Sequence, residues 1–337
     1  REIPFGKPDS LTKVYAIASG KGGVGKSSVT VNLAMALAAQ GLKVGVIDAD
    51  IYGHSIPAMF GIADTRPTQV DDLIMPVPTA SGVSVISIGM LKPRRDQVVA
   101  WRGPMLDRAL VQMLADVYWG DLDALLLDLP PGTGDIAIST AQLVPNAELL
   151  VVTTPQTAAA EVAERAGSIA LQTRQRLAGV VENMSWMELP DGTRMEVFGS
   201  GGGQAVADSL SLALGVPVPL LGQVPLETRL RECSDEGTPI VLTEPDTPAA
   251  VALRRIADRL TLLIARDRGA EASKRADEAS ERAARLESRV RALTAELDAR
   301  TGYRRVIGES PQWRSVLTHA TQVAPNETTV LLLGESG

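Results

Sequence analysis

The chain has 337 residues, of which 45% are hydrophobic and 22% charged, so it can form about two folded domains and is not disordered as a whole. Its 33 Lys and Arg against 40 Asp and Glu give a net charge of -7, which argues against electrostatic binding to nucleic acid or to an anionic membrane. The single cysteine, Cys233, excludes an intrachain disulfide and a metal site built from several thiolates of one chain, and favours the reducing cytoplasm.

Between residues 14 and 264, short apolar runs alternate with longer segments of helical period, which is typical of a parallel sheet covered by helices on both faces. Seven strands are predicted, at 14–19, 43–48, 83–88, 124–129, 149–153, 178–182 and 218–223. Helices are predicted between and after them, at 27–40, 104–117, 157–176, 203–214, 226–232 and 248–265. The expected fold is an α/β domain over residues 1–265 with a doubly wound, mostly parallel sheet.

A glycine-rich loop follows the first predicted strand. Residues 20–27 read Gly-Lys-Gly-Gly-Val-Gly-Lys-Ser, which satisfies G-x-x-x-x-G-K-[ST] and predicts a P-loop NTPase. The glycines let backbone N–H groups surround phosphate oxygens, and the positive end of the following helix points at the same anion. Lys26 is expected to contact the β- and γ-phosphates, and Ser27 to offer its hydroxyl to Mg²⁺. The predicted nucleotide-binding residues of the loop are Gly20, Lys21, Gly22, Gly23, Val24, Gly25, Lys26, Ser27 and Ser28.

The second lysine of the loop narrows the class of ATPase. A Lys-Gly-Gly start is typical of ATPases that pair face to face, in which this lysine, here Lys21, reaches the phosphates of the partner subunit. Its charge would then stabilise the transition state as an arginine finger does. The alternative is a solvated lysine that only raises the local potential.

Acidic residues follow two other predicted strands, at the sheet edge where α/β proteins build their sites. Alternation along the strand puts Asp48 and Asp50 on the same side; Asp50 is expected to orient the attacking water and Asp48 to lie nearer the water shell of the metal. Asp128 ends an apolar strand, an arrangement suited to holding Mg²⁺ through its water ligands. The predicted catalytic residues are Lys21, Lys26 and Asp50, with Ser27, Asp48, Asp50 and Asp128 at the metal. The loop 130–135 is expected to sense the γ-phosphate.

The composition changes near residue 266. Residues 266–300 are nearly half charged, and apolar residues recur there with alternating spacings of four and three. This pattern predicts a coiled-coil helix, and the alternative is a single solvated helix, since an alanine-rich seam buries little area. Residues 301–337 are predicted to hold one helix, 311–323, and one strand, 328–333. The predicted divisions are therefore 1–265, 266–300 and 301–337.

Five segments resemble those of the Mrp/ApbC-type ATPases that carry iron–sulfur clusters, within the larger class of MinD-like and nitrogenase-iron-protein-like ATPases. They are 19–27, 47–53, 101–105, 128–135 and 181–185, and the resemblance spans roughly residues 3–265. It implies ATP and Mg²⁺ as cofactors, ATP hydrolysis, a nucleotide-dependent homodimer, and iron–sulfur client or scaffold proteins as partners. It also implies that Asn183 contacts the adenine and that Gln223, Val224 and Pro225 line the base.

The chain departs from this family where a Cys-x-x-Cys usually follows the Glu-Asn-Met-Ser segment, because residues 188–192 read Glu-Leu-Pro-Asp-Gly. A [4Fe–4S] cluster generally takes four thiolates, and two copies of Cys233 supply at most two. The alternative function is therefore a MinD- or ParA-like positioning or regulatory ATPase without a cluster.

The carboxyl-terminal segments 306–311 and 329–337 resemble the start of the AAA+ domain of bacterial enhancer-binding activators, ending before the lysine that would bind phosphate. Together with a first residue that is not Met, this predicts a fused or truncated product.

Overall fold

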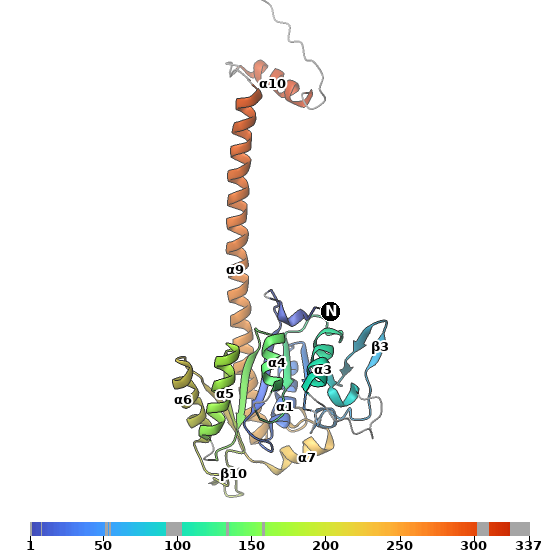
Figure 1. Ribbon diagram of the computed structural model, residues 1–337, viewed down its shortest axis with the longest axis vertical. Helices are drawn as coiled ribbons and strands as arrows, with labels where there is room; N and C mark the ends of the chain where they lie inside the picture. Colours follow the sequence, from blue (N-terminus) through green and yellow to red (C-terminus); the bar gives the residue numbers. More distant parts are fainter. Residues whose placement is uncertain are drawn as a thin grey trace, which may run out of the picture. The chain divides into compact units, whose positions relative to one another are not determined.

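The computed structural model describes residues 2–7, 9–50, 53, 55–91, 103–132, 135–156, 159–301 and 310–323. The chain divides into two compact units, residues 1–269 and 270–337. The first holds the sheet and its covering helices (Figure 1). The predicted strand at 328–333 and the segments 306–309 and 329–337 lie outside the described residues, and the division into three parts stays a prediction.

An eight-stranded sheet forms the centre of the first unit. Neighbouring strands pair in parallel except β5 and β6, which pair antiparallel. In spatial order the strands are β12 (Leu220–Val224), β9 (Leu177–Asn183), β8 (Glu148–Thr153), β1 (Lys13–Ser19), β7 (Ala124–Asp128), β2 (Val44–Asp48), β6 (Ser84–Ser87) and β5 (Val77–Pro78). All seven predicted strands are confirmed, and with them the doubly wound, mostly parallel fold.

Helices cover both faces because alternate side chains of the buried strands point to opposite sides. On β7, Leu126 belongs to one apolar cluster and Leu125 and Leu127 to another. The first cluster includes residues of α1 (Lys26–Ala39), α2 (Ile56–Met59), α7 (Thr228–Glu236), α8 (Ile240–Thr243) and the start of α9 (Pro248–Thr301). The other face is covered by α3 (Gly103–Ala115), α4 (Asp135–Leu143), α5 (Ala159–Thr173) and α6 (Gly202–Leu214).

Several elements were not predicted. They are helices α2, α4 and α8, the short 3-10 helices η1 (Pro4–Gly6) and η2 (Ile88–Leu91), strand β5, and two hairpins, β3 (Thr68–Val70) with β4 (Leu73–Met75) and β10 (Met187–Glu188) with β11 (Arg194–Met195). Helix α7 begins two residues later than predicted, because Glu227 is still extended (φ -132°), and ends before Gly237, whose φ is +71°.

The predicted charged helix after residue 265 is the continuation of α9, which runs unbroken to Thr301. The predicted helix at 311–323 is α10 (Pro311–Val323). No helix among the described residues has the length and apolar character needed to cross a lipid bilayer.

Candidate nucleotide site

The glycine-rich loop joins the end of β1 to the start of α1, and β1 lies between β7 and β8 in the sheet. Gly23 and Gly25 have φ of +78° and +76°, a region that glycine enters without steric cost. Gly25 is also approached so closely by the amide of Asn183 that a Cβ there would collide with it. A Cβ on Gly23 would meet nothing within 4 Å, so at Gly23 the positive φ, and not crowding, favours glycine.

Lys26, the first residue of α1, is directed into the protein. Its Nζ lies 2.7 Å from Oδ1 of Asp128, and the two side chains are 6% and 0% exposed. The ammonium thus forms a buried ion pair with this carboxylate, at the start of the helix that follows the glycine-rich loop.

Asp128 gathers the surrounding polar side chains. Its Oδ2 accepts a hydrogen bond from the Ser27 hydroxyl at 2.6 Å, and its Oδ1 accepts one from the Thr30 hydroxyl at 2.9 Å. The predicted Lys26, Ser27 and Asp128 therefore meet at one point. Thr30 was not predicted, although it lies one helical turn after Lys26, on the same side of α1.

Asp48 lies beside Asp128 because β2 and β7 pair in parallel with these two residues in register. Its carboxyl accepts hydrogen bonds from the Ser87 hydroxyl at 3.0 Å and from the Asp50 backbone N–H at 3.2 Å. Burial and the neighbouring Asp128 carboxylate raise the pKa of Asp48 to about 8. Asp48 is therefore mostly protonated near neutral pH.

Asp48→Asn is expected to raise the melting temperature by several degrees, and by more as the pH increases from about 4 to about 8. The folded wild type keeps the Asp48 proton through this range, whereas the unfolded chain releases it near pH 3.8. Folding therefore takes up a proton, and wild-type stability falls as pH rises until about pH 8. Thermal unfolding measured across this range checks the trend, and a shift independent of pH would contradict it. Asp208→Asn, at an exposed position of helix α6, is the control.

Asp50 is nearly buried, at 8% exposure, and its Oδ1 accepts a hydrogen bond from the Gly53 N–H at 3.1 Å. It follows β2 at the same sheet edge as Asp128.

Lys21 is placed differently from Lys26, since it is exposed and its Nζ donates to Oε1 of Gln156. Within one subunit, Lys21 is thus bonded outside the Lys26–Asp128 cluster. Residues 133 and 134 of the predicted γ-phosphate sensor lie outside the described residues, and Gly132 N–H donates to Ser19 O at 2.9 Å.

Asn183 ends β9 and is 3% exposed. Its Nδ2 donates to the Val24 carbonyl at 2.9 Å, which ties this strand to the glycine-rich loop. Its Oδ1 has no hydrogen-bond partner among the described residues. Pro225, next along from the neighbouring strand β12, lines a cavity of about 390 Å³. The other lining residues are Met187, Glu188, Leu226, Glu227, Thr228, Arg229 and Pro248.

These features fit a nucleotide with Mg²⁺. The buried Lys26 ammonium suits phosphate oxygens, and Asn183 Oδ1, which has no hydrogen-bond partner among the described residues, suits an amino donor such as that of adenine. Mg²⁺ in phosphate sites needs only one or two protein ligands beside phosphates and waters, which Ser27 and Asp128 can supply. The hydroxyl of Ser28, also predicted to bind the nucleotide, is instead bonded to α7, because its Oγ lies 3.1 Å from Oγ of Ser234.

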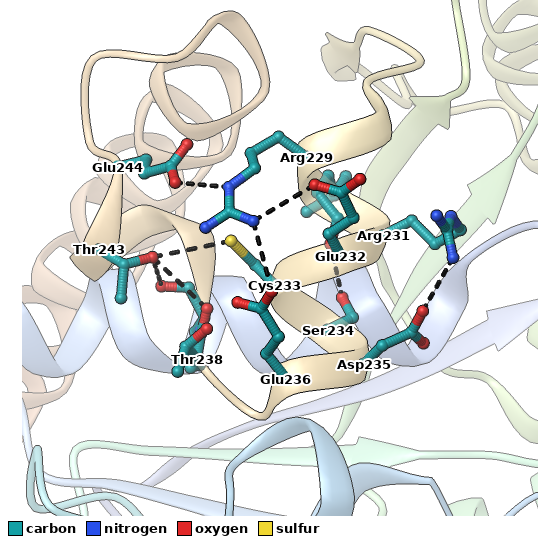
Figure 2. A network of polar contacts seen from close by, with 12 residues as sticks. Arg229, Arg231, Glu232, Cys233, Ser234, Asp235, Glu236, Thr238, Thr243 and Glu244 are labelled. Carbon is teal, nitrogen blue, oxygen red and sulfur yellow. Dashed lines mark hydrogen bonds and ion pairs between the residues drawn. The ribbon is translucent and has the colours of Figure 1, made fainter.

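The residues described do not fit an iron–sulfur cluster. Cys233 is fully buried on α7, with its Sγ 3.8 Å from the Thr243 hydroxyl (Figure 2). Around it, Arg229 pairs with Glu244, Glu232 and Glu236, so the neighbouring acids are already engaged (Figure 2). No group of three or more His, Cys, Asp or Glu side chains within the described residues is arranged to hold a metal ion.

The segment that lacks the Cys-x-x-Cys forms the turn between β10 and β11. Asp191 Oδ1 accepts hydrogen bonds from the Thr193 N–H and hydroxyl, at 2.9 and 2.6 Å, and Leu189 N–H donates to Thr193 O at 2.9 Å. The turn is therefore closed by its own polar groups.

Sequence reasoning missed two residues that bond to predicted site residues, Ser87 and Gln156. Ser87 reaches Asp48 only because β6 lies beside β2, and Gln156 reaches Lys21 only because β8 lies beside β1. Both residues follow or end a predicted strand, which is the one signal that could have marked them.

Comparison with known proteins shows the family of the chain. Residues 10–261 match the ParA family described as NUBPL iron-transfer P-loop NTPase. The "Iron-sulfur cluster carrier protein" of Mycobacterium tuberculosis is 68% identical over 259 residues, which are 77% of this chain and 67% of that protein.

Solved structures give the same fold. A nucleotide-binding protein from Archaeoglobus fulgidus in complex with ADP is 36% identical with a TM-score of 0.59, covering 70% of this chain and 89% of that one. The septum site-determining protein MinD of Pyrococcus horikoshii, complexed with Mg-ADP, shares the fold at 23% identity with a TM-score of 0.55, over 74% of this chain and 96% of that one. The chain therefore belongs to the NUBPL iron-transfer P-loop NTPases of the ParA family.

Proposed function

We propose that this chain hydrolyses ATP with Mg²⁺ as a nucleotide-dependent homodimer and couples that cycle to the delivery of iron–sulfur clusters to client proteins in the cytoplasm. The observation that carries the nucleotide part is the Lys26 ammonium, which the fold buries beside Asp128 at the start of α1, directly after the glycine-rich loop. Support for the delivery part comes from the relatives, which are named as cluster carriers.

In the proposed reaction, backbone N–H groups of the loop and the positive end of α1 bind the phosphates. Lys26 leaves Asp128 and contacts the β- and γ-phosphates, where its charge counters the negative charge of the transition state. Ser27 and Asp128 would hold Mg²⁺, which would neutralise charge on the phosphate oxygens, and Asp50 would orient the attacking water.

The homodimer rests on Lys21. Its side chain is exposed and bonded to Gln156, outside the cluster around Lys26, so it is available to a facing subunit. In a face-to-face pair this ammonium would reach the partner's phosphates and add a positive charge to them.

Lys21→Ala is accordingly expected to abolish ATP-induced dimerisation and to lower kcat by roughly 10²–10³-fold, while leaving the affinity for ATP within about threefold. The change in sedimentation coefficient that ATP induces reports pairing of the ATPase domains, and steady-state turnover reports kcat. Lys43→Ala changes an exposed lysine just before β2 and serves as control. A Lys21→Ala variant whose sedimentation responds to ATP as that of the wild type does would remove the support for a role across the dimer.

A second candidate, a positioning or regulatory ATPase without a cluster, is favoured by the donor set, because Cys233 is buried and the 188–192 turn holds no thiol. Anaerobic reconstitution with iron and sulfide distinguishes the two. The delivery function requires visible absorbance and about four irons per dimer, whereas the second candidate requires neither. A client protein added to the mixture extends the test to ligands supplied in part by that client.

A further inference from the structure

The second compact unit exposes an apolar stripe on α9. We call it the seam; its residues recur with spacings of four and three, which keeps them on one side of a helix. The large members Leu286, Val290 and Leu293 are 57%, 60% and 52% exposed. The seam consists of Ala272, Ala276, Ala279, Ala283, Leu286, Val290 and Leu293. In the part of the chain that the structure describes, all seven are exposed.

The remaining surface of this stretch is strongly polar and carries charge pairs one turn apart. Arg285 lies 3.5 Å from Glu281, and Arg291 lies 3.8 Å from Glu287. Such pairs stabilise an exposed helix by a few tenths of a kcal/mol each and do not require the seam. Large apolar residues confined to one stripe of an otherwise charged helix indicate a partner for that stripe.

We propose that the partner is the same helix of a second copy, aligned in parallel and in register, and that this pairing forms without nucleotide. In-register parallel pairing places each large seam residue opposite itself, with Val290 and the two leucines in adjacent layers. A β-branched residue alternating with leucine in this order is the arrangement that favours two parallel strands.

The charges beside the seam select the same orientation. The positions just before Ala276, Ala283 and Val290 are all arginine: Arg275, Arg282 and Arg289. In a parallel pair, each faces the residue five positions later on the partner helix. These are Ser280, Glu287 and Thr294, so Arg282 meets the partner's Glu287 on both sides of the seam and no like charges meet.

An antiparallel pair centred on the same large residues is disfavoured. With Leu286 opposite the partner's Val290, Arg289 faces its own copy and Glu287 faces its own copy, which places like charges together twice. Leu293 then lies opposite Ala283, so large side chains meet small ones.

The test uses the full chain without nucleotide, in the wild type and in Lys26→Ala. We expect both to dimerise in sedimentation equilibrium, which separates this pairing from the ATP-dependent one. Val290→Asp is expected to raise the dimer dissociation constant by at least about tenfold. A monomeric wild type, or a Val290→Asp variant that dimerises as the wild type does, would overturn the proposal.

Two further variants report orientation. Arg282→Glu and Glu287→Arg are each expected to weaken the dimer several-fold, while the double exchange restores it, because the pair is remade only in the parallel register. Arg285→Glu, which lies away from the seam, is the matched control for charge and should leave the dimer unchanged. Failure of the double exchange to rescue would contradict the parallel register.

Cysteines placed separately at Ala276 and Val290 complete the test. Both should form disulfide-linked dimers on mild oxidation, since each residue faces itself along a parallel pair. An antiparallel pair has one crossing point, so cross-linking at only one position would overturn the proposal. The native Cys233 is fully buried and does not compete.

Discussion

Replacing Lys26 by alanine is expected to abolish detectable ATP turnover, with a loss in kcat/KM of at least roughly 10²–10³-fold. The reason is electrostatic: the Lys26 ammonium is the cation that the fold buries at the phosphate loop, 2.7 Å from Asp128, and the side chain is 6% exposed. Without it, the β- and γ-phosphates would face two carboxyls, Asp48 and Asp128, with no compensating lysine.

Nucleotide-induced stabilisation separates a binding defect from misfolding. A ligand at about 100 times its dissociation constant stabilises the folded state by about 2.7 kcal/mol. The wild type should show this gain in a thermal shift with ATP and Mg²⁺, whereas Lys26→Ala should show none although it still unfolds cooperatively. Lys7→Ala removes an exposed lysine, at 50% exposure, and should behave as the wild type. Turnover within about threefold of wild type in Lys26→Ala would contradict the site.

The sheet was predictable because its strands are buried on both faces. In such a sheet the strands read as continuous apolar runs, and Leu125 to Leu127 before Asp128 is an example that needs no other information. Helix α4 was missed because it follows directly on the loop 130–135, whose prolines and glycines indicate irregular structure. Its sequence also contains β-branched residues, which weaken the helical signal.

Within the site, residues close together in the sequence were predictable, whereas contacts between distant residues were not. The loop, Lys26 and Ser27 follow from spacing, because they lie within eight successive residues. That Ser87 holds Asp48, or that Asn183 holds the loop through Val24, depends on strand order, which puts β6 beside β2 and brings the end of β9 to the loop. A single sequence does not encode that order in any local pattern, so these contacts emerge only from the fold.

A buried ion pair at the amino-terminal ends of β1 and β8 leads to the second large predicted effect, a loss of folding stability. Lys13 begins β1 and Glu148 begins β8, and the two groups lie 2.7 Å apart at 9% and 8% exposure. Lys13 also lies 2.5 Å from Asp267 of α9, and Arg176 lies 2.7 Å from Glu148. Burial opposes ionisation of Asp267, but the hydrogen bond and charge of Lys13 outweigh it and hold the pKa of that carboxyl below its usual range.

Lys13→Met is therefore expected to lower the free energy of unfolding by about 3 kcal/mol at neutral pH, because Glu148 stays buried with only the exposed Arg176 beside it. The loss should shrink below about pH 4, because the stability that the lowered pKa of Asp267 provides is full above its unfolded pKa and is lost as the pH falls through the lower folded pKa. Denaturant titration of the full chain measures both values. The same substitution at Lys7, whose pair with Glu2 is exposed, should leave the free energy of unfolding nearly unchanged.

A double variant tests the cause. If the loss in Lys13→Met comes from an uncompensated buried charge, adding Glu148→Leu should recover most of it, because a buried ion pair replaced by apolar groups is often neutral in stability. If the loss instead comes from packing of the lysine stem, the second substitution should add to the first. An additive result would attribute the stability loss to packing, and recovery would attribute it to the lost charge of Lys13.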